Sequence, residues 1–146
     1  MLEAATIIDR LKATVPTLAS VEGAAELAAL LASPAQVWNR TRAHVVPLGI
    51  RGGVVLDAAG AFVQAIDVTF AVYLSFASHG DAKGTRKLDD VSVMQNAIIA
   101  TLCGWVPAGV TSQGEVRLSR AYLADLKPGA IVYALEFAVS DQLRII

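Results

Sequence analysis

Hydrophobic and polar positions recur along the chain with two different periods. One period, of 3.6 residues, predicts amphipathic helices over residues 2–15 and 85–105. The first of these helices is expected to end before Pro16, because the residue preceding a proline is pushed out of the helical region. An Ala-rich segment, 24–32, predicts a short helix between them. The apolar stripe of the long helix comprises Leu88, Val91, Met94, Ile98 and Leu102.

The other period, of two residues, predicts strands. Residues 66–76 alternate most regularly, and residues 130–140 follow the same rule. Further strands are expected over residues 114–123 and over residues 35–47, which are rich in β-branched and aromatic side chains. Residues 18–23 form a short extended passage.

Residues 48–60 separate two of these strands and contain four glycines with no helical period. This pattern predicts a long hairpin loop. The order of elements therefore predicts one α+β domain, 1–146, with a mostly antiparallel sheet of about four strands, the helices being packed on one face.

The composition narrows the classes of function. Hydrophobic residues make up 55% of the chain, charged residues make up 17%, and the net charge is −1. This balance argues against a nucleic-acid binder that depends on a basic face, and the Ala-rich apolar excess favours tight packing or subunit contacts. No stretch reaches the roughly 18 apolar residues of a spanning helix. A lone cysteine and an N-terminal segment without a basic region predict a cytosolic chain.

Residues capable of catalysis are few. His44 lies on a predicted strand, His79 in a predicted turn and Cys103 at a helix end, and no local signature of a nucleophile joins them. Asp89 and Asp90 fall near the start of the long helix, where acids complement the helix dipole, and no second acidic cluster completes a metal site.

Two further groups are expected to be structural. The segment 49–53 lacks the glycine spacing and the Lys-Ser/Thr ending of a phosphate-binding loop. A basic cluster is expected to be a solvated edge rather than a nucleic-acid surface; it comprises Arg40, Arg42, His44 and Arg51. No catalytic, cofactor-binding or metal-binding residues are predicted.

The stretch "LCGWVP", residues 102–107, follows the long helix. Gly104 can adopt the left-handed conformation that closes a helix, and Pro107 prevents its resumption. Trp105 can then fold back on the apolar face of the helix. Local physics therefore predicts a helix terminator with an aromatic anchor.

The order of these motifs is informative as a whole. Val21 precedes the Ala-rich short helix, Pro34-Ala35 precedes a strand, and Gly104-Trp105-x-Pro107 follows the long helix. In this order and spacing the chain resembles the tail terminator-like proteins of long-tailed bacteriophages and related phage-derived particles.

The resemblance implies a subunit of a ring, usually hexameric, on the last ring of the tail tube. The ring would stop tube polymerisation and present a surface to the head connector, while DNA passes through its lumen without sequence-specific binding. It implies a protein of the virion neck, assembled in the host cytoplasm, with no catalytic residues or cofactors. Other head–tail connector and tail-completion subunits share similar folds and are the neighbouring alternatives.

Two segments are candidate interfaces. We expect the apolar loop to order on a neighbouring subunit or on tube protein, through Leu48, Ile50, Arg51, Val54, Val55 and Leu56. The C-terminal residues Leu143, Ile145 and Ile146 are expected either in a subunit interface or over the domain's own core. Acidic side chains should outnumber basic ones in the lumen, where DNA slides past.

Two rival functions belong to other classes. A small enzyme or ligand-binding domain would use a pocket near Trp105 and His79, and a deep monomeric cavity with convergent polar groups would reveal it. A dimeric cytosolic regulatory domain is the other rival. Neither explains the loop, the apolar balance and the motif order together.

Overall fold

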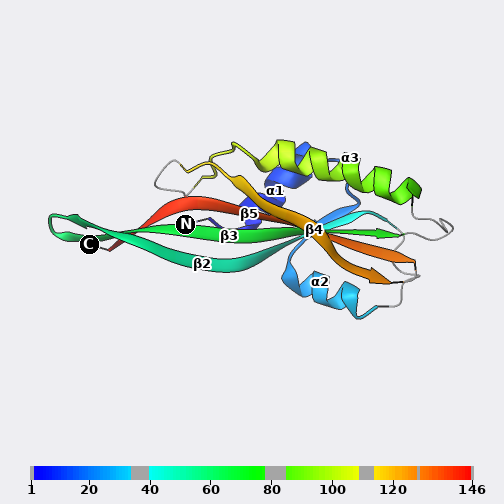
Figure 1. Cartoon of the computed structure of the whole chain (residues 1–146), viewed down its shortest axis with the longest axis horizontal. Coiled ribbons are helices and arrows are strands. Elements are labelled where there is room, and N and C mark those ends of the chain that lie inside the picture. The colour runs from blue at the N-terminus through cyan, green and yellow to red at the C-terminus, as the bar shows by residue number, and fades with distance from the viewer. Residues whose placement is uncertain (1, 34–39, 78–84, 109–113, 128, 146) are drawn as a thin grey trace.

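The computed structural model describes residues 2–33, 40–77, 85–108, 114–127 and 129–145. Within these ranges the chain forms three helices and five strands, so the α+β class is confirmed (Figure 1). In chain order they are α1 (Ala4–Thr14), β1 (Ser20–Glu22), α2 (Ala24–Leu31), β2 (Arg42–Ala58), β3 (Ala61–Ala77), α3 (Thr85–Leu102), β4 (Arg117–Lys127) and β5 (Ala130–Ile145).

The five described strands form one mixed sheet in the order β1-β2-β3-β5-β4. All neighbours are antiparallel except β1, which lies parallel to β2 and pairs Val21 with Ala43. The expectation of about four antiparallel strands is therefore incomplete. Residues 18–23 were expected to be extended, but three residues carry no pattern that predicts a parallel partner far along the chain.

Alternation along β3 builds the main core. The even-numbered side chains from Ile66 to Phe76 are buried against α1 and α3, as the period of two predicts. Fully buried members of this core include Ile7, Leu11, Leu74, Phe76, Ile98, Leu102, Leu135 and Phe137. The rings of Phe70 and Phe137 stack with centroids 5.4 Å apart, which joins β3 to β5 on this face.

Helix α2 lies on the opposite face of the sheet, so the prediction that all helices pack on one face is wrong. Its Leu30 packs with Ala130 and Val132 of β5 and with Tyr73, an odd-numbered residue of β3. Figure 1 shows α1 and α3 on one side of the strands and α2 on the other. A helical period shows that a helix has an apolar stripe, but not which face of a sheet the stripe covers.

Residues 48–60 are not a loop, so the prediction of a long hairpin loop is wrong. Strand β2 runs through this segment to Ala58, and the chain turns at Gly60, whose φ is +78°. Register shifts between Pro47 and Gly49 and between Gly52 and Val55 are β-bulges, and each extra residue reverses the side-chain alternation. The glycines and the broken period therefore conceal a continuous strand.

The end of α3 shows why the chain carries "LCGWVP". The helix ends at Leu102, and Gly104 adopts a φ of +81°, in the left-handed region that favours glycine. Gly104 N–H donates to the Val116 carbonyl at 2.8 Å, and Val116 N–H donates to the Trp105 carbonyl at 2.9 Å. The helix end is thus tied to the residues that lead into β4.

Several boundaries differ from the expected ones. The strand expected at 35–47 begins at Arg42, and residues 35–39 lie outside the described part of the chain. The strand expected at 114–123 runs from Arg117 to Lys127, and that expected at 130–140 continues to Ile145. Among the described residues, no helix has the length and apolar character needed to cross a membrane.

Candidate functional site: an exposed apolar arm

The ends of three strands project from the body of the molecule as one arm. We define the arm as residues 48–64 of the β2–β3 hairpin together with residues 142–145 of β5. Figure 1 shows these strand ends at one end of the long axis, with the C-terminal end of β5 beside the hairpin. The helices cover the strands nearer the body and leave the arm uncovered.

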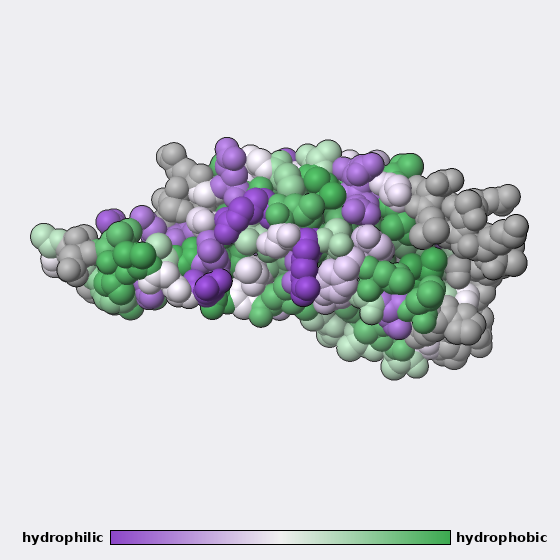
Figure 2. All heavy atoms as spheres, viewed as in Figure 1, coloured by the Kyte–Doolittle hydropathy of each residue, from purple (hydrophilic) through white to green (hydrophobic). Residues whose placement is uncertain are grey.

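Large apolar side chains are exposed along the arm. Their exposed fractions lie between 42% and 70%, and Figure 2 shows hydrophobic surface near this end of the molecule. They are Leu48, Ile50, Val54, Val55, Leu56, Phe62 and Ile145. Exposed apolar side chains gathered on one part of a folded domain mark a site of contact with another molecule.

The arm brings together the two segments that the sequence suggested separately. Gln64 of β3 pairs with Val55 of β2 on one side and with Leu143 of β5 on the other. Phe62, two residues away on the same face, pairs with Ile145. The register therefore places Val55, Phe62, Leu143 and Ile145 on one face of the arm, whereas Leu56, which pairs with Val63, lies on the other face.

The structure adds Phe62 to the exposed apolar residues of the arm, and it shows that Leu143 is less exposed than Ile145. Phe62 was overlooked because its alternation matches that of the core residues Ile66 and Val68, and only the tertiary structure shows that no helix covers it. Leu143 is half-buried and packs against the core, whereas Ile145 is exposed. Ile146 lies outside the described residues.

A bulge in β2 sets the direction of the arm's side chains. The Gln64 amide Nε2 donates to the Gly53 carbonyl at 3.1 Å, so β3 holds the bulge closed. A Cβ atom at Gly53 would lie 3.1 Å from the Ala65 carbonyl oxygen, a contact that a larger residue would have to relieve. The bulge therefore depends on close approach of the two backbones, and it turns Val54 and Val55 outward at its end.

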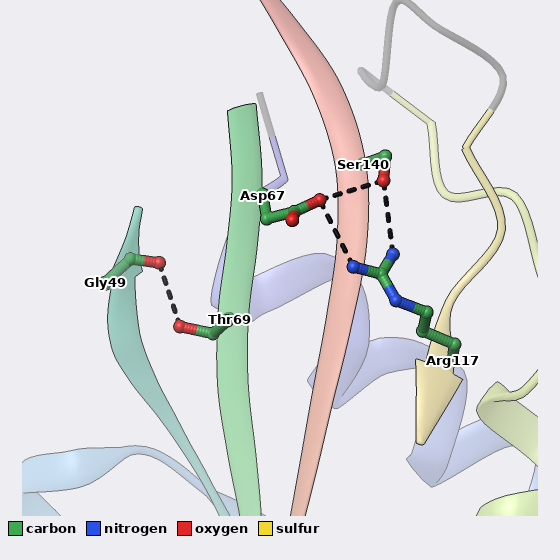
Figure 3. A network of polar contacts seen from close by, with 5 residues as sticks. All are labelled: Gly49, Asp67, Thr69, Arg117 and Ser140. Atoms are coloured by element: carbon green, nitrogen blue, oxygen red, sulfur yellow. Dashed lines mark hydrogen bonds and ion pairs between the residues drawn. The ribbon is translucent and has the colours of Figure 1, made fainter. Parts of the chain in front are cut away.

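A polar network ties the base of the arm to the body (Figure 3). The Ser140 hydroxyl donates to Asp67 Oδ1 at 2.8 Å, and Arg117 contacts the same carboxylate oxygen at 3.2 Å and donates to Ser140 Oγ at 3.1 Å. The Ser140 hydrogen bond, and then Arg117, lower the pKa of the Asp67 carboxyl below its usual value, although burial opposes them. Side chains of β3, β5 and β4 are thereby joined across the sheet.

The backbone of β2 is held at the same level of the arm. The Thr69 hydroxyl donates to the Gly49 carbonyl at 3.1 Å, as Figure 3 shows beside the Asp67 network. Arg51 pairs in register with Asp67, and its side chain is exposed. The base of the arm is therefore polar, while the surface beyond it is apolar.

The basic cluster considered from the sequence is not formed. His44 is buried, with Nε2 4.0 Å from Glu22 Oε2, whereas Arg51 lies on the arm and is exposed. Burial lowers the pKa of His44 below its usual value, in opposition to Glu22, so the imidazole is held neutral. It adds no charge to the surface.

The residues of the rival pocket have structural contacts where they are described. Trp105 is half-buried, the Arg10 guanidinium carbon lies 4.6 Å from the centroid of its ring, and Arg10 Nε donates to the Thr101 carbonyl at 2.8 Å. Trp105 therefore anchors α1 to the end of α3. Cys103 is half-buried beside the same core.

Three further residues considered from the sequence have no described side chain. His79 lies outside the described residues, and the side chains of Asp89 and Asp90 do as well. Among the described side chains, no group of three or more His, Cys, Asp or Glu could hold a metal ion.

A groove lies beside α2, on the body of the molecule and away from the tip of the arm (Figure 1). It has a volume of about 470 Å³ and runs between α2 and the adjoining strands. It is lined mainly by apolar side chains, namely those of Ala24, Leu27, Ala28, Leu31, Val46, Tyr73, Tyr122, Ala124, Asp125 and Val132. The groove is open to solvent and is a second surface on which a protein segment could bind.

An elongated α+β subunit with an apolar arm at one end and an apolar groove on its body belongs to the class of proteins that assemble with other protein chains. The chain matches the family model described as phage tail terminator protein over residues 1–146, and it belongs to this family. It is thus a structural component of a phage tail. A comparison with curated proteins finds no significant match.

Proposed function

We propose that this subunit forms a closed ring, a hexamer, on the last ring of the tail tube. The ring ends tube polymerisation and presents its other face to the head connector. Family membership supports a role in the tail, and the exposed arm is the observation that supports self-assembly. Seven large apolar side chains in one projection, left uncovered by their own domain, are expected to be buried in an assembly.

The lumen of the ring is proposed to pass DNA without reading its sequence. A net charge of −1 leaves the chain without the basic excess that holds a phosphate backbone, and we expect acidic side chains to outnumber basic ones on the lumen wall. The proposed function requires no cofactor, metal or catalytic residue. It is structural, and the chain acts in the virion after assembly in the host cytoplasm.

Assembly of the purified chain tests the ring. Light scattering should give a mass of about six copies, or rings should appear in negative stain at the tips of tail tubes when the tube protein is supplied as template. Tubes polymerised with the chain present should be shorter and blunt-ended. A chain that stays monomeric and binds no tube, but binds the head connector, would identify it instead as another connector or tail-completion subunit.

The arm is tested by a pair of matched substitutions. Val54 on the arm and Val93 on α3 are both 70% exposed. Val54→Asp should abolish the ring and the shortening of tubes, because it puts a charge in a desolvated contact, whereas Val93→Asp should leave both intact. Both should change the free energy of unfolding by less than about 0.5 kcal/mol, since neither residue is buried. Equal loss of assembly in both variants would contradict the role of the arm.

A further inference from the structure

We propose that the arm of one subunit binds in the groove beside α2 of the next copy, so that each ring contact joins two different surfaces. The inference rests on the proposed ring and names the partner of the arm. The occupant of the groove is therefore a second copy of this chain, and not tube protein or a small ligand.

The positions of the two surfaces support a head-to-tail contact. The arm lies at one end of the long axis and α2 with the adjoining end of β4 lies toward the other, as Figure 1 shows. A surface that pairs with a different surface of an identical subunit forms a heterologous contact, which repeats around a ring when the rotation closes. A single self-complementary patch would form a dimer instead.

The chemistry of the two surfaces is complementary. The apolar side chains that line the groove and are exposed to solvent include Ala28 and Leu31 of α2 and Ala124 of β4. The arm offers Val54, Phe62 and Ile145, which its own domain leaves exposed. Burying these side chains against one another removes apolar area from water on both copies, which drives association.

Charge also matches across the proposed contact. Among the described side chains of the arm, the charged ones are Arg51 and Arg144, and both are exposed. The charged residue among those that line the groove is Asp125, which is exposed. Glu26 of α2 is exposed as well. Arg51 and Arg144 of one copy can therefore pair with Asp125 and Glu26 of the next. Asp57 also belongs to the arm, and its side chain lies outside the described ones.

The proposal is tested by cross-linking in a Cys103→Ala background, which removes the native thiol. Val54→Cys is placed on the arm and Leu31→Cys on the groove, and a short bismaleimide is added to assembled rings, with tube protein present if it is needed as template. A mixture of the two single variants should yield a covalent dimer, and neither variant alone should. The double variant should yield a ladder that ends at the number of subunits in the ring.

A matched control replaces the arm position by Val93→Cys, whose parent residue is as exposed as Val54. Mixed with Leu31→Cys, it should give less than about a tenth of the dimer, because exposure alone does not bring two thiols together. Circular dichroism on each variant shows that the fold is retained.

The outcomes separate this proposal from the function on which it rests. Rings that form without the Val54–Leu31 cross-link overturn the docking and leave the ring standing. A cross-link from Val54→Cys alone indicates an arm-to-arm contact and overturns it as well. If Val54→Cys is cross-linked to tube protein and not to another copy of this chain, the arm binds the tube and the docking is overturned. A chain that forms no ring on its own or on tubes overturns the proposed function itself.

Discussion

Gly104 illustrates how one residue can decide where an element ends. Its φ of +81° disfavours every residue with a Cβ, and its N–H is committed to Val116, so the chain leaves α3 in a fixed direction. The sequence predicted this role from the helical period that stops there and the proline that follows. Local patterns of this kind are predictable because they involve only neighbours in the chain.

Gly104→Ala should therefore lower the free energy of unfolding by about 1–2 kcal/mol, since alanine must adopt the left-handed conformation. Gly104→Asn should cost less, because asparagine tolerates that conformation better. Urea unfolding followed by Trp fluorescence measures both. Equal losses in the two variants would mean that space, and not backbone conformation, limits this position, although a Cβ there would contact nothing within 4 Å.

The Asp67 network shows what residue patterns leave unpredicted. Asp67 and Ser140 are 73 residues apart, and they meet only because β3 and β5 are neighbours in the sheet. Nothing near Asp67 in the sequence indicates this partner or Arg117. The strand order, which places residues far apart in the chain side by side, has to be known first.

The network predicts a dependence of stability on pH. The folded-state pKa of Asp67 is depressed, so its contribution is present above the unfolded value, about 4, and is lost as the pH falls through the folded value. Asp67→Asn should lower stability at neutral pH by less than about 1 kcal/mol, because the pair is half-exposed, and the difference should vanish in acid. Unfolding curves of the parent chain and of Asp67→Asn, measured from pH 7 down to about pH 2, give this difference. A difference that persists at the acidic end would show that Asn fails to pack, rather than that a charge is lost.

At the scale of elements, β2 shows why residues 48–60 have the sequence pattern of a loop. Its bulges at Pro47/Gly49 and Gly52/Val55 shift the alternation twice, so that a continuous strand has the pattern of a loop. The consequence for experiment is direct. Deletion of residues 50–58, harmless if they were a loop, would remove the residues of β2 that pair with β3 from Ala61 to Val68. Point substitutions such as those at Val54 test the arm without this loss.

The C-terminal strand allows its two possible roles to be separated. Leu143 is half-buried and packs on the core, whereas Ile145 is 57% exposed on the arm. Leu143→Asp should lower the free energy of unfolding by about 1–3 kcal/mol, since it places a charge against the core. Ile145→Asp should change stability by less than about 0.5 kcal/mol and should prevent ring formation. Thermal melts and light scattering on both variants give the two readouts.

The opposite pattern, in which Ile145→Asp destabilises the domain and rings still form, would assign the strand end to the core alone. The sequence left these roles equally open, because the apolar pattern of the last residues is the same in both cases. Burial differs between neighbouring positions only once β5 lies beside β3.

At the scale of the whole molecule, sequence patterns supported the class of fold and the family but not the arrangement of layers. The helix–strand order indicated an α+β fold, and the motif order indicated a tail terminator, the family to which the chain belongs. The face on which α2 lies and the parallel pairing of β1 were not predictable. Both depend on contacts among distant segments, for which a single sequence has no periodic signal.

The strand order also has a consequence for the time course of folding. The hairpin of β2 and β3 is local and can form as soon as Ala77 has been synthesised, whereas β5, which pairs along the whole of β3, comes last. Until then one edge of β3 is open, and its exposed amide and carbonyl groups are a template for pairing with another nascent chain. The yield of soluble subunit should therefore fall as the growth temperature or the expression rate is raised. This loss should begin at temperatures below those at which the folded domain unfolds.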